Sequence, residues 1–325
     1  MINFVPFVNP KTQSPLKKTF NYFIDIFTNE KFPILNKIPR FCDKENYSSS
    51  FGFQWNTFRE TQLDSKSNTD LSYQRFYATT DWDPIILAQE NILEVGSGAG
   101  RFTEVFLNSC NGFLHSIDLS NAVEANLKNN IRNSNRLSIA QASIYEMPFE
   151  DNAFDRVFCF GVLQHTPSFS KSIISLINKT KIGGEIVVDF YPIKGWYTKL
   201  HAKYILRPIT KRLPQKFLLK LIRINIRWMI ILFDLMCFLK LNVLTRFIPI
   251  ADISTSPSKL NSKQRRNRAI MDTFDAFSPV FDNPQKIKDV TKMFTSNGCK
   301  VSFAGVINYH ENCYSYVVRA IKKVN

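Results

Sequence analysis

The chain has 325 residues, 44% of them hydrophobic and 14% aromatic, so it can bury a sizeable core and exceeds one minimal domain. All of its net charge of +15 arises between Lys194 and Arg268, where 17 Lys and Arg stand against two acidic residues. The six cysteines are scattered without a Cys-x-x-Cys pair, which argues for a reducing compartment and against structural zinc.

The beginning of the chain is apolar but lacks the basic and hydrophobic regions of an export signal, so we expect a cytoplasmic protein. Residues 1–85 predict an aromatic-rich N-terminal cap made mostly of loops, with a weak helical pattern only over 19–27. Aromatic side chains are dense over 47–58. Either these rings cover the edge of a sheet, or Trp55 and Arg75 line a wall over a bound cofactor or acceptor.

The stretch from Asn91 to Phe102 organises the rest of the chain. An apolar run predicts a strand, three glycines alternate with small residues, and a helical pattern begins at Phe102. Glycines let the main chain approach a ligand, and the first N–H groups of the helix point at it. The spacing differs from the Gly-x-Gly-x-x-Gly of dinucleotide-binding folds, and the charge of Glu94 opposes a phosphate.

A second predicted strand, 115–120, ends in an acidic residue whose carboxylate can accept both hydroxyls of a ribose. Together, these two motifs resemble the class I S-adenosylmethionine-dependent methyltransferases. The resemblance implies that the glycine-rich turn holds the amino-acid part of the cofactor S-adenosylmethionine and that the second acid holds its ribose. The residues to which these roles carry over are Glu94, Gly96, Ser97, Gly98 and Gly100 for the turn and Asp118 for the ribose, and Leu119 is a further expected cofactor-binding residue.

A helix over 122–131 and a third strand over 137–142 follow, and this alternation predicts a parallel sheet. In the subgroup that the chain most resembles, an aspartate commonly stands where this chain has Ser143 and contacts the adenine amino group. Ser143 can still accept a hydrogen bond there, and Ile144 would flank the base.

A third motif spans 154–167, where an apolar fourth strand opens into a loop at the carboxyl edge of the sheet. It is similar to the Phe-Asp … Leu-x-His-x-Pro element of the ubiquinone/menaquinone-type methyltransferases. These enzymes have a methyltransferase type 11-like domain. This similarity places Phe160 at the cofactor. Gly183 and Gly184 match the turn before the fifth strand of that subgroup, expected at 185–191. The resemblance covers roughly residues 75–192.

His165 lies at the lip of the fourth strand and has two interpretations. It takes a proton from an acceptor hydroxyl and is then catalytic, or it shapes the cofactor loop. Asp272 and Asp275 lie three residues apart, but a helix cap and a solvated acid explain them, and no third ligand has a persuasive spacing. We therefore expect no metal.

Residues 193–270 form a basic insertion that a minimal methyltransferase lacks. Within it, 213–241 predicts a helix with charged residues on one narrow stripe and apolar residues on the broad remainder. Its uncharged stretch is too short to span a bilayer. Three roles stay open for this helix: a lid or dimer element, a peripheral contact with an anionic membrane surface on the inner face, or nucleic-acid binding, which its apolar character disfavours. The charged stripe consists of Lys216, Lys220, Arg223, Arg227 and Asp234.

Residues 271–325 complete the core, with a helix opened by Asn283 and Pro284 and strands at 300–306 and 314–321. We predict an α/β fold with a Rossmann-like, doubly wound, mostly parallel sheet, an antiparallel C-terminal edge, and the cofactor-binding core at 86–192. The expected function is methyl transfer from S-adenosylmethionine to a small-molecule, lipid-linked or glycan acceptor. The alternatives are an NAD-dependent oxidoreductase and a non-catalytic, membrane-associated protein that retains the cofactor fold.

Overall fold

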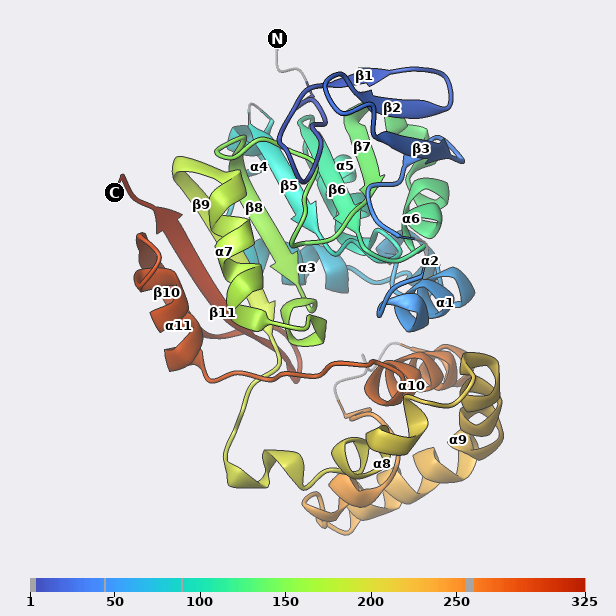
Figure 1. Ribbon diagram of the computed structural model, residues 1–325. Helices are drawn as coiled ribbons and strands as arrows, with labels where there is room; N and C mark the ends of the chain where they lie inside the picture. The colour runs from blue at the N-terminus through green and yellow to red at the C-terminus, as the bar shows by residue number, and fades with distance from the viewer. Residues whose placement is uncertain (1–3, 44, 89, 255–259, 325) are drawn as a thin grey trace. The chain divides into compact units, whose positions relative to one another are not determined.

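The computed structural model describes residues 4–43, 45–88, 90–254 and 260–324, and the chain divides into two compact units (Figure 1). Unit 1 comprises residues 1–192, 281–309 and 314–325. Unit 2 comprises residues 193–280 and 310–313. Residues 271–280 therefore cluster with the insertion and not with the C-terminal part of the sheet.

The centre of unit 1 is a seven-stranded sheet with the order β10-β11-β9-β8-β5-β6-β7. The five strands β5 to β9 run parallel, and β11 pairs antiparallel with β9. This arrangement confirms the predicted Rossmann-like sheet with an antiparallel C-terminal edge. The strands are β5 (Asn91–Val95), β6 (Phe113–Asp118), β7 (Leu137–Gln141), β8 (Phe154–Phe160), β9 (Thr180–Phe190), β10 (Cys299–His310) and β11 (Cys313–Lys322).

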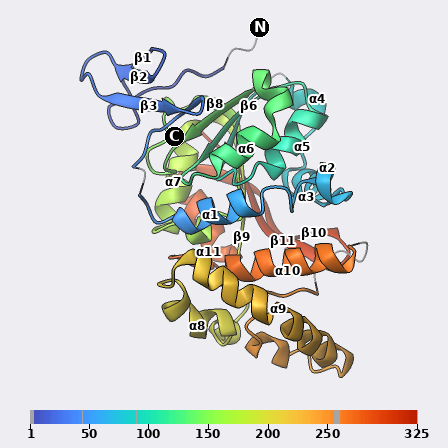
Figure 2. The ribbon, with the colours of Figure 1, turned by 90° about the vertical axis from the view of Figure 1, so that its right-hand side faces the viewer.

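Helices cover both faces of this sheet (Figures 1 and 2). On one face, the apolar sides of α3, α5 and α6 meet the strands, and Phe102, Val105 and Phe106 of α5 are buried there as their helical spacing predicts. On the other face, α7 and α11 bury a second core. These helices are α3 (Leu71–Thr80), α5 (Arg101–Ser109), α6 (Val123–Asn129), α7 (Phe169–Lys179) and α11 (Ile287–Thr295).

The N-terminal segment differs from the expectation, because it contains a four-stranded sheet where loops and a weak helix over 19–27 were predicted. The side chain of Thr19 accepts the N–H of Tyr22, and Asp25 accepts the N–H groups of Phe27 and Thr28. Such side-chain contacts to nearby N–H groups favour turns over a helix, so a hairpin forms. The strands are β1 (Leu16–Lys18), β2 (Tyr22–Asp25), β3 (Lys31–Leu35) and β4 (Ile38–Pro39).

Three short helices follow this sheet. The last of them begins as predicted near Pro84, with the Asp83 side chain accepting the N–H of Ile85, but it ends after one turn. The first lies entirely within the aromatic stretch 47–58. These helices are α1 (Ser49–Thr57), α2 (Asp64–Ser67) and α4 (Pro84–Leu87), and two 3-10 helices are η1 (Ile131–Arg136) and η2 (Leu163–His165).

Two further boundaries differ from the sequence expectation. Gly183 and Gly184 lie inside β9 and not in a turn before it, because the pairing of β8 with β9 shifts register between Phe154 and Arg156. The extra residues of this bulge include Gly183, whose φ is 81°. The last helix, α11, begins at Ile287 and not at Pro284.

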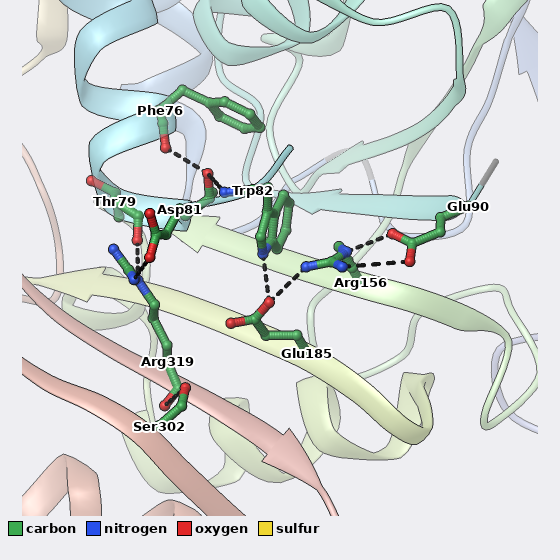
Figure 3. A network of polar contacts seen from close by, with 10 residues as sticks. Phe76, Thr79, Asp81, Trp82, Glu90, Arg156, Glu185, Ser302 and Arg319 are labelled. Carbon is green, nitrogen blue, oxygen red and sulfur yellow. Dashed lines mark hydrogen bonds and ion pairs between the residues drawn. The ribbon is translucent and has the colours of Figure 1, made fainter. Parts of the chain in front are cut away.

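Charged side chains join the strands at the amino edge of the sheet, opposite the glycine-rich turn (Figure 3). Arg156 of β8 contacts both Glu90 (2.5 Å) and Glu185 (2.7 Å), and the indole of Trp82 donates to the same Glu185 oxygen at 2.7 Å. Arg319 of β11 pairs with Asp81 at 2.8 Å. Each of these charged side chains has a partner of opposite charge, which indicates that the group has a structural role.

Unit 2 consists of helices with a core of their own. The guanidinium of Arg207 donates to the carbonyl of Ala276, and the hydroxyl of Thr210 donates to that of Phe277 at 2.8 Å, so α8 is fixed to the end of α10. The elements are η3 (Trp196–Lys199), α8 (Ala202–Thr210), α9 (Gln215–Phe238), η4 (Leu244–Phe247) and α10 (Ser262–Phe277).

Candidate functional site

The glycine-rich turn connects β5 to α5 at the carboxyl edge of the parallel strands. Gly96 has φ of 81°, and a Cβ built on it would lie 2.2 Å from a methyl carbon of Val162. Only glycine fits there, because both the backbone conformation and the space exclude a side chain. The N–H groups of Gly96 and Ser97 donate to the carbonyl of Ile117 at 2.7 and 3.1 Å, which ties the turn to the neighbouring strand.

Asp118, at the end of β6, points at this turn. Its Oδ2 accepts the N–H of Gly98 at 2.8 Å, while Oδ1 accepts the N–H and the hydroxyl of Ser120 at 2.7 and 2.6 Å. Burial raises the pKa of Asp118, and these hydrogen bonds oppose the rise. A carboxylate has about four acceptor positions, so three donors leave room for another. The two motifs expected to act together therefore lie within one hydrogen bond of each other.

Glu94 lies beneath the turn and is 2% exposed. Its Oε2 accepts the hydroxyls of Thr103 and Ser116 at 2.5 and 2.8 Å, and the side-chain amide of Asn126 donates to both of these hydroxyl oxygens. Burial raises the pKa of Glu94 to about 7, although its hydroxyl donors oppose that shift. One carboxyl oxygen thus belongs to the scaffold of the turn.

Two buried polar atoms at the turn lack a partner among the described residues: Glu94 Oε1 and Ser97 Oγ. An unpaired buried polar atom is costly, and such atoms commonly mark the place of a ligand or an ordered water. The residues present therefore fit a ligand with several hydrogen-bonding groups, such as the amino-acid part and ribose of S-adenosylmethionine.

The remaining expected cofactor residues lie in different environments. Ser143 is half-buried after β7, and its hydroxyl accepts the N–H of Tyr145 at 3.2 Å. Ile144 is buried in the core on the α7 face. Phe160 lies in the opposite core, 5.2 Å from the ring of Phe102, so it is an aromatic core residue in this structure.

Leu119 is held by its carbonyl group. This oxygen accepts the side-chain amide of Gln141 at 2.9 Å and that of Asn46 at 3.2 Å. The loop after β6 is therefore fixed both to β7 and to the segment before α1.

Helix α1 lies across the turn and the loop after β6. A Cβ on Gly98 would lie 3.1 Å from the indole nitrogen of Trp55, and one on Gly52 would lie 3.2 Å from the amide nitrogen of Asn121. The side-chain amide of Asn56 also donates to the carbonyl of Asn121 at 3.1 Å. The indole of Trp55 therefore lies against the glycine-rich turn.

Arg75, the other expected wall residue, has a different contact. Its guanidinium lies 2.5 Å from Oδ2 of Asp189 at the end of β9, and Oδ1 of Asp189 accepts the N–H of Gly161 at 2.6 Å. Burial opposes the charge of Arg75, but Asp189 and nearby tyrosines raise its pKa. Sequence reasoning missed Asp189, although an acidic residue near the end of a predicted parallel strand was a usable signal.

His165 ends η2 and is buried between the rings of Phe51 (5.0 Å) and Tyr191 (5.5 Å). Its Nδ1 lies 2.9 Å from the carbonyl oxygen of Phe281, which can only accept, so Nδ1 carries the proton and Nε2 is the basic nitrogen. The neighbouring Gln164 is fully buried, and its side-chain amide has no partner among the described residues. Sequence reasoning missed Gln164, because a glutamine at this position carries no sequence signal of a functional role.

Residues 93–188 match a protein-family model described as "Methyltransferase domain". The chain is 28% identical over 106 residues to phosphoethanolamine N-methyltransferase 2 of Caenorhabditis elegans, covering 31% of this chain and 24% of the relative. It is 30% identical over 115 residues to tRNA U34 carboxymethyltransferase of Nautilia profundicola, covering 34% of this chain and 37% of that one. The match thus spans between about a quarter and two fifths of these relatives.

Among solved structures, the fold is similar to a chain in the complex between the Haloferax volcanii Trm112 methyltransferase activator and a methyltransferase. The TM-score is 0.50 at 9% sequence identity, and the likeness covers 85% of this chain and 99% of that chain. At this identity, the likeness concerns the fold alone.

Proposed function

Because the chain contains a class I S-adenosylmethionine-dependent methyltransferase domain, we propose that it transfers a methyl group to an acceptor bound at the carboxyl edge of its central sheet. The observation that carries this proposal is the 2.8 Å contact between Asp118 and the N–H of Gly98. It joins a carboxylate suited to a ribose with a main-chain turn suited to an amino-acid group.

S-adenosylmethionine carries both the methyl group and the leaving group of the reaction. The protein therefore has mainly to align the acceptor with the methyl carbon, to enclose both molecules and to exclude water. In this proposal, Asp118 holds the ribose by accepting one of its hydroxyls, and the turn with Ser97 binds the amino-acid part. Ser143 and Ile144 contact the adenine. Trp55 covers the turn, since its indole lies against Gly98.

We further propose that His165 acts as a base when the acceptor is a hydroxyl. The Phe281 carbonyl accepts the proton of Nδ1 and so orients the imidazole, and the acceptor proton would be taken up on Nε2. The rings of Phe51 and Tyr191 flank the imidazole, and a dry setting favours a defined proton transfer over exchange with water.

The proposed acceptor is a small molecule or a lipid- or glycan-linked molecule. The matched relatives are named for phosphoethanolamine and for tRNA, so the shared domain by itself accommodates different acceptors. The basic insertion favours an acceptor presented at an anionic membrane surface over a nucleic acid, because its charges accompany a strongly apolar helix.

Calorimetry with S-adenosylhomocysteine and with NAD tests the cofactor assignment. We expect the first to bind and Asp118→Ala to weaken it at least tenfold, while Asp289→Ala, an exposed acid on α11, leaves it unchanged. Preferential binding of NAD would overturn the proposal.

The acceptor is then sought with tritium-labelled S-adenosylmethionine added to cell fractions. Label is expected in the lipid, polysaccharide or small-molecule fraction, and His165→Ala should lower this transfer without lowering cofactor affinity. Label confined to RNA or protein would overturn the acceptor class, and cofactor binding without any transfer would indicate a non-catalytic protein.

A further inference from the structure

Helix α9 (Gln215–Phe238) has two apolar faces, of which unit 2 uses one. The inner face is buried, and α9 packs against α10 within unit 2; Figure 2 shows these two helices side by side. The buried residues are Leu218, Leu219, Ile222, Ile226, Met229 and Phe233.

The outer face carries a second apolar row, which we call the outer stripe. Its members follow one another at intervals of three or four residues, so they share one side of the helix along its whole length. All are exposed, from 37% at Leu221 to 83% at Phe238. The outer stripe consists of Phe217, Leu221, Ile224, Trp228, Ile231, Leu235 and Phe238.

Exposed apolar residues continue beyond the helix, at Leu239, Leu241, Val243, Leu244 and Phe247. A surface this apolar over so many consecutive turns is unusual for a face that meets only water, and it marks a binding surface.

A row of cations runs beside the outer stripe. Its members are spaced by three or four residues, all are exposed, and within the described part of the chain none forms an ion pair. The helix has one acidic residue, Asp234, which pairs with Arg265 at 2.6 Å. The basic row consists of Lys216, Lys220, Arg223 and Arg227.

We propose that α9 lies flat on an anionic lipid bilayer, with the outer stripe at the boundary of headgroups and acyl chains and the basic row against the headgroups. An exposed apolar face flanked by unpaired cations is complementary to such a surface in both hydrophobicity and charge. Across the described residues, no helix combines the length and apolar character that crossing a membrane requires, so the contact is peripheral.

Two observations argue against a second copy of the chain and against a nucleic acid as the partner of this surface. A second copy of α9 would bring two basic rows toward each other, and a nucleic acid would leave the outer stripe in water. The inference rests on the proposed function for its purpose, since the surface would bring the methyltransferase domain to a lipid-linked acceptor.

Cosedimentation with vesicles of phosphatidylglycerol and phosphatidylcholine tests the proposal, with pure phosphatidylcholine vesicles as the comparison. The stripe variant is Ile224→Gln, Ile231→Gln and Leu235→Gln, and the basic-row variant is Lys220→Gln, Arg223→Gln and Arg227→Gln. All six residues are exposed, so the fold of unit 2 should tolerate the changes.

We expect the full chain to bind the anionic vesicles and the neutral ones much less. The basic-row variant should lose about 100-fold in partition coefficient, from about fivefold for each cation. The stripe variant should lose at least tenfold. Matched controls in unit 1 should bind like the original chain: Lys286→Gln, Lys288→Gln and Lys292→Gln for charge, and Ile85→Gln, Ile131→Gln and Ile182→Gln for apolar exposure.

Quenching by brominated acyl chains separates insertion from adhesion. In a Trp196→Phe background, which removes the other exposed tryptophan of unit 2, we expect the emission of Trp228 to be quenched. An unquenched Trp228, or a stripe variant that still binds like the original chain, would overturn the proposal.

Two further results would assign the surface to another partner and overturn the membrane proposal. One is tRNA binding that depends on the basic row alone, and the other is a dimer in light scattering that the stripe variant abolishes. Calorimetry with S-adenosylhomocysteine is run on every variant without vesicles. Failure there would count against the proposed methyl transfer, whereas failure with vesicles would count against this surface only.

Discussion

Trp55 of α1 lies directly against Gly98 of the glycine-rich turn, so that a Cβ on Gly98 would come within 3.1 Å of the indole nitrogen. A residue distant in sequence from the turn thus forms part of its cover. We expect Trp55→Ala to speed dissociation of S-adenosylhomocysteine by roughly tenfold, because a large aromatic contact over the ligand is lost. Stopped-flow measurement checks this, with Trp196→Ala as the control, since Trp196 is exposed in unit 2. Equal rates for the two variants would show that Trp55 is packing alone.

Gly96 is the position of the turn least able to accept a side chain. Gly96→Ala is expected to lower the free energy of unfolding by about 2 kcal/mol or more, because the φ of 81° is strained for alanine and the new Cβ meets Val162. Adding Val162→Ala should restore the part that comes from the contact and leave the backbone strain. Urea titration of the single and double variants measures both parts. No recovery in the double variant would contradict the role given to Val162.

The buried ion pair of Arg75 and Asp189 supports the loop after β8. Arg75→Leu should lower the free energy of unfolding by about 3 kcal/mol, because it leaves the charge of Asp189 buried without a cationic partner. A second change, Asp189→Asn, removes that charge and keeps an oxygen for the N–H of Gly161, so it should recover much of the loss. Thermal and urea unfolding of the three variants provides the comparison. A double variant no more stable than Arg75→Leu would contradict this account.

Glu94 should make stability depend on pH. Burial raises its pKa in the folded chain to about 7 from an ordinary value of 4.5. The folded state therefore holds a proton that the unfolded state releases, and this contribution is complete below pH 4.5 and lost as the pH rises through about 7. Relative to the original chain, Glu94→Gln should gain up to about 1.4 kcal/mol per pH unit within that window. Parallel profiles for the two proteins between pH 4.5 and 7 would rule this out.

His115 should act in the opposite direction. It is fully buried in β6, and burial lowers its pKa from 6.5 to about 3. Its contribution to stability is present above pH 6.5 and is lost as the pH falls toward 3, because the unfolded chain then takes up a proton that the folded chain refuses. Replacing it with leucine should flatten the acid side of the profile, as measured by urea unfolding at a series of pH values. A variant with the same acid-side slope would assign that slope to other groups.

The alternation of apolar runs and turn signals was sufficient to predict the doubly wound sheet, because β5, β6 and β8 each lie where a buried run ends at a glycine or an acid. The motif residues likewise predicted that Asp118 and Gly98 lie at the same edge of the sheet. In the structure, the N–H of Gly98 donates to Oδ2 of Asp118 at 2.8 Å. The assignment of the individual site residues to cofactor and catalysis remains a prediction.

Other features depend on contacts that no local pattern carries. The hairpin at β2 depends on turn contacts made by Thr19 and Asp25, and its apolar spacing resembles that of a weak helix. Arg75 and Asp189 are separated by more than a hundred residues, so their pairing follows from how α3 packs on β9. Periodicity identified the apolar majority of α9, but only the packing of unit 2 divides it into a buried and an exposed face.

The hydrogen bonds between Arg319 and α3 affect the order in which the chain can complete its contacts during synthesis. The guanidinium of Arg319 donates to the carbonyls of Ala78 and Thr79 at the end of α3, the helix that also carries Arg75. During synthesis, all elements from α3 to β10 are therefore made before Arg319, whose side chain fixes the end of this helix. Nascent chains that end before Arg319 would carry the motifs of the domain, but the end of α3 would lack these hydrogen bonds.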